Sequence, residues 1–152
     1  MNKQLFGCLL ALVCILASCK PKEQNNFAEV VQIVDEVEMI VNKYDSAVSV
    51  ALESKKIDFI KVLSRGAMDS TNLKLNDLKA LNILPPNEEL RTGSINYITA
   101  LQKLITAENQ YSLITDTTTL EMAKQMDAGV SKEINTVEQM RYKYRLILKK
   151  SI

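Results

Sequence analysis

Apolar residues recur every three or four positions along most of the chain after Phe27, and this spacing predicts α-helices. In the first segment seven such positions form one seam: Val30, Val34, Val37, Val41, Tyr44, Val48 and Ala51. Valine loses rotamer freedom in a helix, so this helix depends on packing against its neighbours. We therefore expect Val37 to be buried. We also expect Asn26 and Glu29 to cap the start of the helix.

The residues Glu53-Ser54-Lys55-Lys56 interrupt this seam, and we expect Ser54 to cap a second helix. The apolar positions of that helix are Ile57, Ile60, Leu63, Ala67, Leu78 and Leu81. Gly66 and the cluster Ser70-Thr71-Asn72 weaken the helical pattern here. One continuous helix from Asn26 to Leu63 is an alternative, although four helices of similar length favour the break.

A third helix follows Leu84-Pro85-Pro86-Asn87, because proline pushes the residue before it out of the helical region. We expect Asn87 to cap this helix. The helix would span about 28 residues, with a rise of 1.5 Å per residue. Its apolar positions are Leu90, Tyr97, Leu101, Leu104, Ile105 and Tyr111.

A capping box, Thr118-Thr119-Leu120-Glu121, predicts the start of a fourth helix. Its apolar stripe is Leu120, Ala123, Met126, Val130, Ile134, Val137, Met140, Tyr144 and Ile147. We expect Ile134 to be buried and Ala128-Gly129 to allow a close approach to a neighbouring helix. Four such helices joined by short loops predict an all-α fold, an antiparallel up-down-up-down four-helix bundle, as one domain over residues 27–152.

Residues 1–18 have a different pattern, in which Lys3 precedes an apolar run from Leu5 to Ala17. This is typical of a secretory signal peptide, and the run is shorter than the ~20 apolar residues that cross a bilayer. It ends in Leu16-Ala17-Ser18-Cys19, which resembles the lipobox of bacterial lipoproteins. An ordinary secretory signal that contains cysteine is the alternative.

The lipobox resemblance implies that residues 1–18 are removed and that Cys19 carries a diacylglyceryl group, often with a further acyl chain such as palmitate on its amino group. Residues 19–26 are then the lipidated cysteine and a polar linker. Lys20, rather than Asp, follows the cysteine. By resemblance to enteric lipoproteins, this favours the outer membrane over the inner one.

The stretch from Asp77 to Ile114, with its Pro-Pro turn and tyrosine-bearing helix, resembles uncharacterised all-helical surface lipoproteins of Gram-negative bacteria. The resemblance is one of pattern, so it supports the fold and implies no activity.

Composition narrows the function further. With 47% apolar residues, 24% charged residues and a net charge of +1, the chain is neither disordered nor a strongly basic nucleic-acid binder. It contains no histidine, which removes His-based triads and His-ligated metals. Cleavage before Cys19 would remove the other two cysteines, so no internal disulfide could form. We therefore expect no catalytic residues, no cofactor and no metal.

The sequence offers two acidic candidate sites, a pair of carboxylates and a single one. Asp35 and Glu38 share one helix face and could hold a hard cation, although a solvated face is the better interpretation. Glu108 borders the apolar stripe of the third helix, as a functional acid or as the partner of a base from the fourth helix. Pairing is the commoner outcome for such a group.

Arg141, Arg145 and Lys149 step by four and form a basic ridge on the last helix. Cations in a last turn offset the helix dipole, and contact with an anionic lipid surface is the functional alternative.

These features predict a membrane-anchored, non-catalytic lipoprotein domain of the cell envelope that binds a protein or an envelope component. The partner, the oligomeric state and exposure to the periplasm or the cell surface stay open. The alternative is a bundle that binds a small molecule or an ion, in a cavity lined by Tyr44, Tyr97, Tyr111 and Tyr144.

Overall fold

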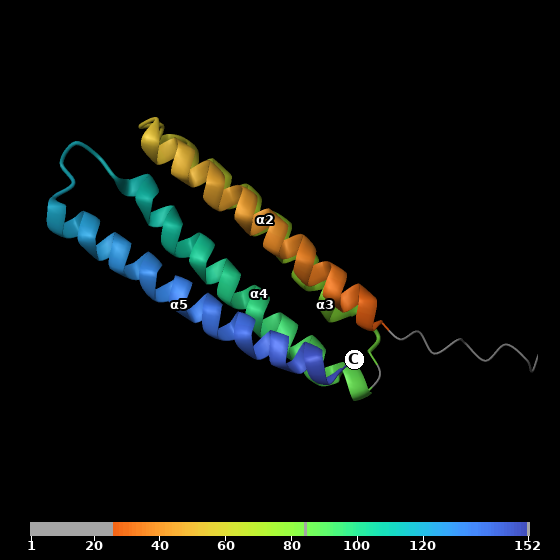
Figure 1. Ribbon diagram of the computed structural model, residues 1–152. Coiled ribbons are helices and arrows are strands. Elements are labelled where there is room, and N and C mark those ends of the chain that lie inside the picture. The colour runs from red at the N-terminus through yellow and green to blue at the C-terminus, as the bar shows by residue number, and fades with distance from the viewer. Residues whose placement is uncertain (1–25, 84, 152) are drawn as a thin grey trace, which may run out of the picture.

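The computed structural model describes residues 26–83 and 85–151, and these ranges form four long helices without a strand. The helices, with two short 3₁₀ helices between them, are α2 (Phe27–Glu53), α3 (Asp58–Ala80), η1 (Pro85–Asn87), α4 (Glu88–Glu108), η2 (Asn109–Leu113) and α5 (Leu120–Lys150). Figure 1 shows successive helices running in opposite directions, so α2 begins and α5 ends at the same end of the molecule. The predicted all-α four-helix bundle is confirmed.

The seam of α2 forms one wall of the core, as predicted. All seven of its positions are buried, and Val37 is completely inaccessible to solvent. Asn26 does not cap the helix with its side chain as we expected. Instead, its Nδ2 donates to the carbonyl oxygen of Asn82 at 2.8 Å. This bond ties the start of α2 to the connection between α3 and α4.

Helix α3 continues through the polar cluster that weakened its sequence pattern. Thr71 is fully buried, and its Oγ1 donates to the carbonyl oxygen of Met68 at 3.0 Å. Ser70 donates in the same way to Gly66 at 2.8 Å. A serine or threonine hydroxyl that donates to a carbonyl of the preceding turn finds its hydrogen-bond partner within the helix. Small polar residues can therefore occupy the packed face of the helix.

The chain breaks between α2 and α3, so the alternative of one continuous helix is wrong. The N–H of Lys56 donates to the carbonyl of Ala51 at 2.8 Å, and that of Lys55 donates to Leu52 at 3.1 Å. This pair of bonds is a Schellman motif, with Lys55 in the left-handed region at φ 57°. Ser54 is the C-cap residue of α2, so the prediction that Ser54 caps α3 is wrong.

The third predicted helix is shorter than the sequence suggested. Helix α4 ends at Glu108 after 21 residues, and the chain tightens into η2. Asn87 occupies the N-cap position of α4, but it makes no side-chain capping hydrogen bond. The start of α5 is capped one residue later than predicted, because Thr119 Oγ1 accepts from the N–H of Met122 at 3.2 Å.

Helix α5 packs along α4 and makes few contacts with α2 or α3. Its buried residues are Val130, Val137 and Tyr144. The expectation that Ile134 is buried is wrong, since 45% of its surface is exposed. A helix that packs against one neighbouring helix buries only a narrow line of side chains. The broad stripe predicted for α5 would need two neighbouring helices to cover it.

The close approach expected at Gly129 is also wrong. A Cβ atom added there would meet no atom within 4 Å. The close approach occurs at Gly93 of α4, where an added Cβ would lie 2.6 Å from Ile147 Cδ1 of α5. Glycine therefore brings the end of α5 near to α4.

Replacing Lys55 by glycine should stabilise the domain by about 1 kcal/mol, because glycine adopts the left-handed conformation without a Cβ clash. Urea unfolding of a soluble form that begins at Lys20 measures this gain. The control Lys56→Gly should lower stability, since it adds only backbone freedom to the unfolded chain. A loss of stability in Lys55→Gly would contradict the assigned C-terminal motif of α2.

Candidate functional site

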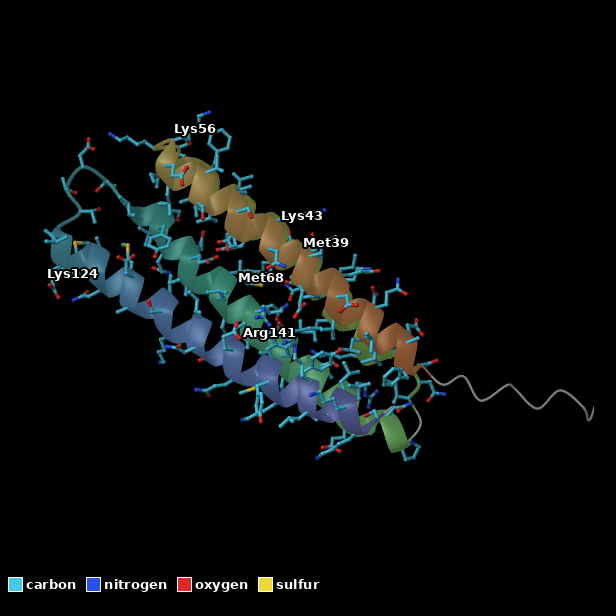
Figure 2. All side chains as sticks on the ribbon, in the orientation of Figure 1. Met39, Lys43, Lys56, Met68, Lys124 and Arg141 are labelled. Carbon is cyan, nitrogen blue, oxygen red and sulfur yellow. The ribbon has the colours of Figure 1, made fainter. Side chains whose placement is uncertain are left out.

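Arg141 of α5 points inward instead of forming part of an exposed ridge. Its Nε donates to Tyr97 Oη at 2.8 Å and lies 3.6 Å from Glu38 Oε1. Its Nη1 donates to Glu138 Oε1 at 2.6 Å. In Figure 2, Arg141 lies over α4, between the ribbons of α2 and α5. One guanidinium therefore connects three helices.

Tyr97 is the centre of this cluster. It is fully buried, and its hydroxyl donates to Glu38 while accepting from Arg141. Burial, followed by the hydrogen bond to Glu38, raises the pKa of Tyr97, so the hydroxyl keeps its proton. Its ring stacks on that of Tyr144 with centroids 5.7 Å apart, and the guanidinium lies 5.9 Å from the ring centroid of Tyr97. The cluster binds α5 to the rest of the bundle by charge, hydrogen bonds and stacking.

The remainder of the basic ridge faces solvent. Arg145 and Lys149 are exposed, whereas the Arg141 side chain is 30% exposed and engaged with Tyr97. The hydrogen bond that Arg141 donates to Tyr97 raises the pKa of Arg141 above its usual value. Of the three predicted contacts for an anionic surface, two are freely available.

Glu108 lies in the core with 4% of its surface exposed. Its partner is Asp45 of α2, and the expectation of a base from the fourth helix is wrong. Burial, followed by the hydrogen bond and charge of Asp45, raises the pKa of Glu108 to about 8. Within the described residues, its Oε2 has no hydrogen-bond partner. Burial and the neighbouring Asp45 therefore favour the protonated form of Glu108 at neutral pH.

The four tyrosines proposed to line a cavity are engaged in hydrogen bonds or in the packing of the core. Tyr44 donates to the Ile105 carbonyl at 3.3 Å, and Tyr111 donates to Asp127 at 2.8 Å. Burial raises the pKa of Tyr111 and of Tyr144 to about 12. Five hollows on the described surface are open, and these tyrosines line none of the five.

Asp35 and Glu38 line one of these hollows, with a volume of about 600 Å³, on the exposed flank of α2. Met39 and Lys43 line it too, and Figure 2 shows both on α2. Across residues 26–83 and 85–151, no group of three or more carboxylate, cysteine or histidine side chains could hold a metal ion. Glu38 therefore belongs both to the lining of this hollow and to the cluster at Tyr97.

Cys19, the predicted lipidation site, lies outside the described residues, as do the signal segment and most of the linker. Among the helices described, none is long and apolar enough to cross a membrane.

The stability of the domain should depend on pH through Glu108. The folded protein holds this proton up to about pH 8, whereas the unfolded chain releases it near pH 4.5. Unfolding free energy should therefore fall between about pH 5 and pH 8. Glu108→Gln removes this titration, so its stability relative to the native protein should rise by about 3–4 kcal/mol between pH 5 and pH 8.

Urea unfolding from pH 5 to pH 9 tests this expectation. Glu53→Gln, at an exposed carboxylate at the end of α2, is the matched control and should give no such gain with pH. A stability difference between Glu108→Gln and the native protein that stays constant over this range would contradict the assigned proton.

Comparison with known proteins adds no family to these observations. No protein-family model matches the chain, and no curated protein and no solved structure matches it. The function must be argued from the surfaces and side chains described above.

Proposed function

We propose that the chain is a lipid-anchored, non-catalytic domain of the cell envelope that binds a protein partner through the open sides of α5. The observation that carries this proposal is the packing of α5, which buries three of its 31 residues and contacts chiefly α4. Both flanks of α5 are therefore accessible along much of their length. An open groove between helices is a common binding site for a helix of a partner.

The exposed flanks of α5 also carry large apolar side chains. Met122, Ile134, Tyr142 and Leu146 are each more than 40% exposed. Scattered apolar residues are normal on a protein surface, but these four lie on one helix that has little other packing. Aromatic residues and methionine are enriched in protein interfaces, which favours a protein as the ligand.

The charged groups of the interior support a role without catalysis. Glu108 is buried beside Asp45, and Arg141 is bound to Tyr97 and Glu138. None of these groups lines any of the five hollows described above. The alternative of a small-molecule or ion-binding bundle has less support, because Tyr44, Tyr97 and Tyr144 are buried in the core and Tyr111 donates to Asp127.

The anchor is proposed from the sequence alone. The resemblance of Leu16-Ala17-Ser18-Cys19 to a lipobox places the acyl chains seven residues before Asn26. Since α2 begins where α5 ends, this end of the bundle would face the membrane. The opposite end would project by about 40 Å, the length of α2 at 1.5 Å per residue. Lys20 favours the outer membrane as the site of attachment.

Replacing Cys19 by alanine tests the anchor. The variant should carry no lipid and should leave the membrane fraction or stay uncleaved, because the thiol is the only group that accepts the diacylglyceryl chain in this scheme. Mass spectrometry of the mature N-terminus of the native protein should find an acylated Cys19. An unmodified Cys19, or a chain that begins elsewhere, would exclude the lipoprotein.

The exposed cations Arg145 and Lys149 support a second, weaker contact with anionic lipid at the anchored end. Each cation near such a surface contributes about 1 kcal/mol, and salt screens the attraction. The soluble form should therefore float with anionic vesicles at low salt and less at high salt. Reversing both residues to glutamate should abolish flotation. No flotation of the native form at low salt would exclude this contact and leave the helix dipole as the role of these cations.

A further inference from the structure

Three shallow hollows adjoin one another on the outer face of α4. One of about 290 Å³ lies between α3 and α4, and two of about 380 and 270 Å³ lie between α4 and α5. Thr106 lines the first two, and Ala107, Gln110 and Gly129 line the last two. The shared residues show that the three hollows adjoin across α4, and we call this surface the α4 furrow.

The floor of the furrow is apolar and adaptable. Ala107 and Gly129 leave space between α4 and α5, and a Cβ atom on Gly129 would meet no atom within 4 Å. Met68, Met122 and Met126 line the furrow from α3 and α5. Methionine side chains adjust their shape to a ligand, which is why they recur on surfaces that bind helices.

The rim of the furrow is basic. Four exposed cations from three helices surround it: Lys61, Arg65, Lys103 and Lys132. Only two acidic residues, Asp69 and Glu133, share the lining. Among the described residues, none of the four cations forms an ion pair. Cations without partners around an apolar floor select a ligand with negative charges on its flanks.

An unpartnered acceptor lies in the wall of the furrow. Asn109, at the start of η2, lines the hollow toward α3, and its Oδ1 is buried without a hydrogen-bond partner in the described part of the chain. A buried polar atom of this kind costs free energy until a donor reaches it. A bound ligand could supply that donor.

The position of the furrow suits a partner in solution. Ala107 and Gln110 lie where α4 ends, at the end of the bundle opposite to the start of α2. The α2–α5 side differs, because Arg141 already bridges it to Tyr97 and Glu38. The α4 furrow is therefore the unbridged side of α5 and the one with charge of mainly one sign.

From these observations we infer that the α4 furrow binds an acidic amphipathic helix of a partner protein. A trough between antiparallel helices accommodates another helix, whose apolar residues at every third or fourth position would contact the floor. Its glutamate and aspartate residues would face the four cations. The inference rests on the proposed protein-binding function and names the surface and the chemistry of its partner.

Site-specific photo-crosslinking of the full-length, lipidated protein in the cells that produce it tests the inference. A photoreactive residue at Gln110 probes the furrow, and one at Val50 is the matched control. Val50 is 62% exposed on α2 and lies outside the furrow. Capture at Gln110 should exceed capture at Val50 at least about fivefold. Mass spectrometry should map the captured peptide to a net-negative segment with apolar residues three and four apart.

Charge and shape variants should change the capture at Gln110. Reversing Lys103 and Lys132 to glutamate should lower it at least about fivefold, because the attraction becomes repulsion. The control reversal of Lys79 and Lys143, two exposed lysines that do not line the furrow, should leave it unchanged.

Gly129→Leu should also lower the capture without a change of charge, since the added side chain fills empty space. Circular dichroism should show each variant as helical as the native protein.

Several results would overturn the inference. The first is equal capture at Gln110 and Val50. The second is capture that the reversal of Lys103 and Lys132 does not reduce. The third is capture of a basic peptide, of lipid or of a second copy of this chain. A third probe at Ile134 separates the two proposals. Capture of a protein at Ile134 alone would leave the protein-binding function standing without the furrow. Capture of no protein at any of the three positions would exclude both.

Discussion

The seven-residue spacing of Val130, Val137 and Tyr144 gives α5 a single line of contact with the bundle, and the shape of the molecule depends on it. Each buried apolar side chain contributes roughly 1.5–3 kcal/mol. These three residues, together with the partly buried Met140, Ile147 and Leu148, attach one side of α5 to the core. Helices α2, α3 and α4 contact one another, whereas α5 contacts chiefly α4.

The polar groups near this contact explain how so narrow an attachment becomes specific. Tyr97 stacks on Tyr144, and its hydroxyl joins Glu38 of α2 to Arg141 of α5. A hydrogen bond with a charged partner depends strongly on geometry, so the cluster fixes the position of α5 along α4. The α2 side of α5 is thereby bridged, while the α3 side keeps its cations unpaired. The two flanks of one helix acquire different chemistry.

Local pattern in the sequence predicts the elements and much of the core. The valine seam of α2 is buried as a whole, and the Pro-Pro turn and the threonines before Leu120 mark helix ends to within a residue or two. These features depend on neighbours along the chain. The error at Ile134 is different, because periodicity records which side of a helix is apolar and not how many helices cover it. The same limit applies to Gly129.

The site residues illustrate contacts that no local pattern specifies. Glu108 pairs with Asp45 across 63 positions of sequence, and a carboxylate as its partner would not be chosen over a base. The spacing of Arg141, Arg145 and Lys149 predicts an exposed ridge, yet the long side chain of Arg141 reaches Tyr97 in the core. Such pairings follow from how the helices pack. The left-handed conformation of Lys55 could not be predicted for another reason, because glycine, and not lysine, usually indicates that conformation.

Helix α5 packs chiefly on α4, and cysteine labelling at two adjacent turns tests this arrangement most directly. A soluble form that begins at Lys20 has no cysteine of its own, so Ile134→Cys and Val137→Cys can each be labelled separately. Ile134 is 45% exposed and Val137 is 4% exposed. The thiol at position 134 should react at the rate of an unfolded control, and the one at 137 at least about a hundredfold more slowly. Equal protection of both positions would show a closed bundle, in which neither flank of α5 is free to bind a partner.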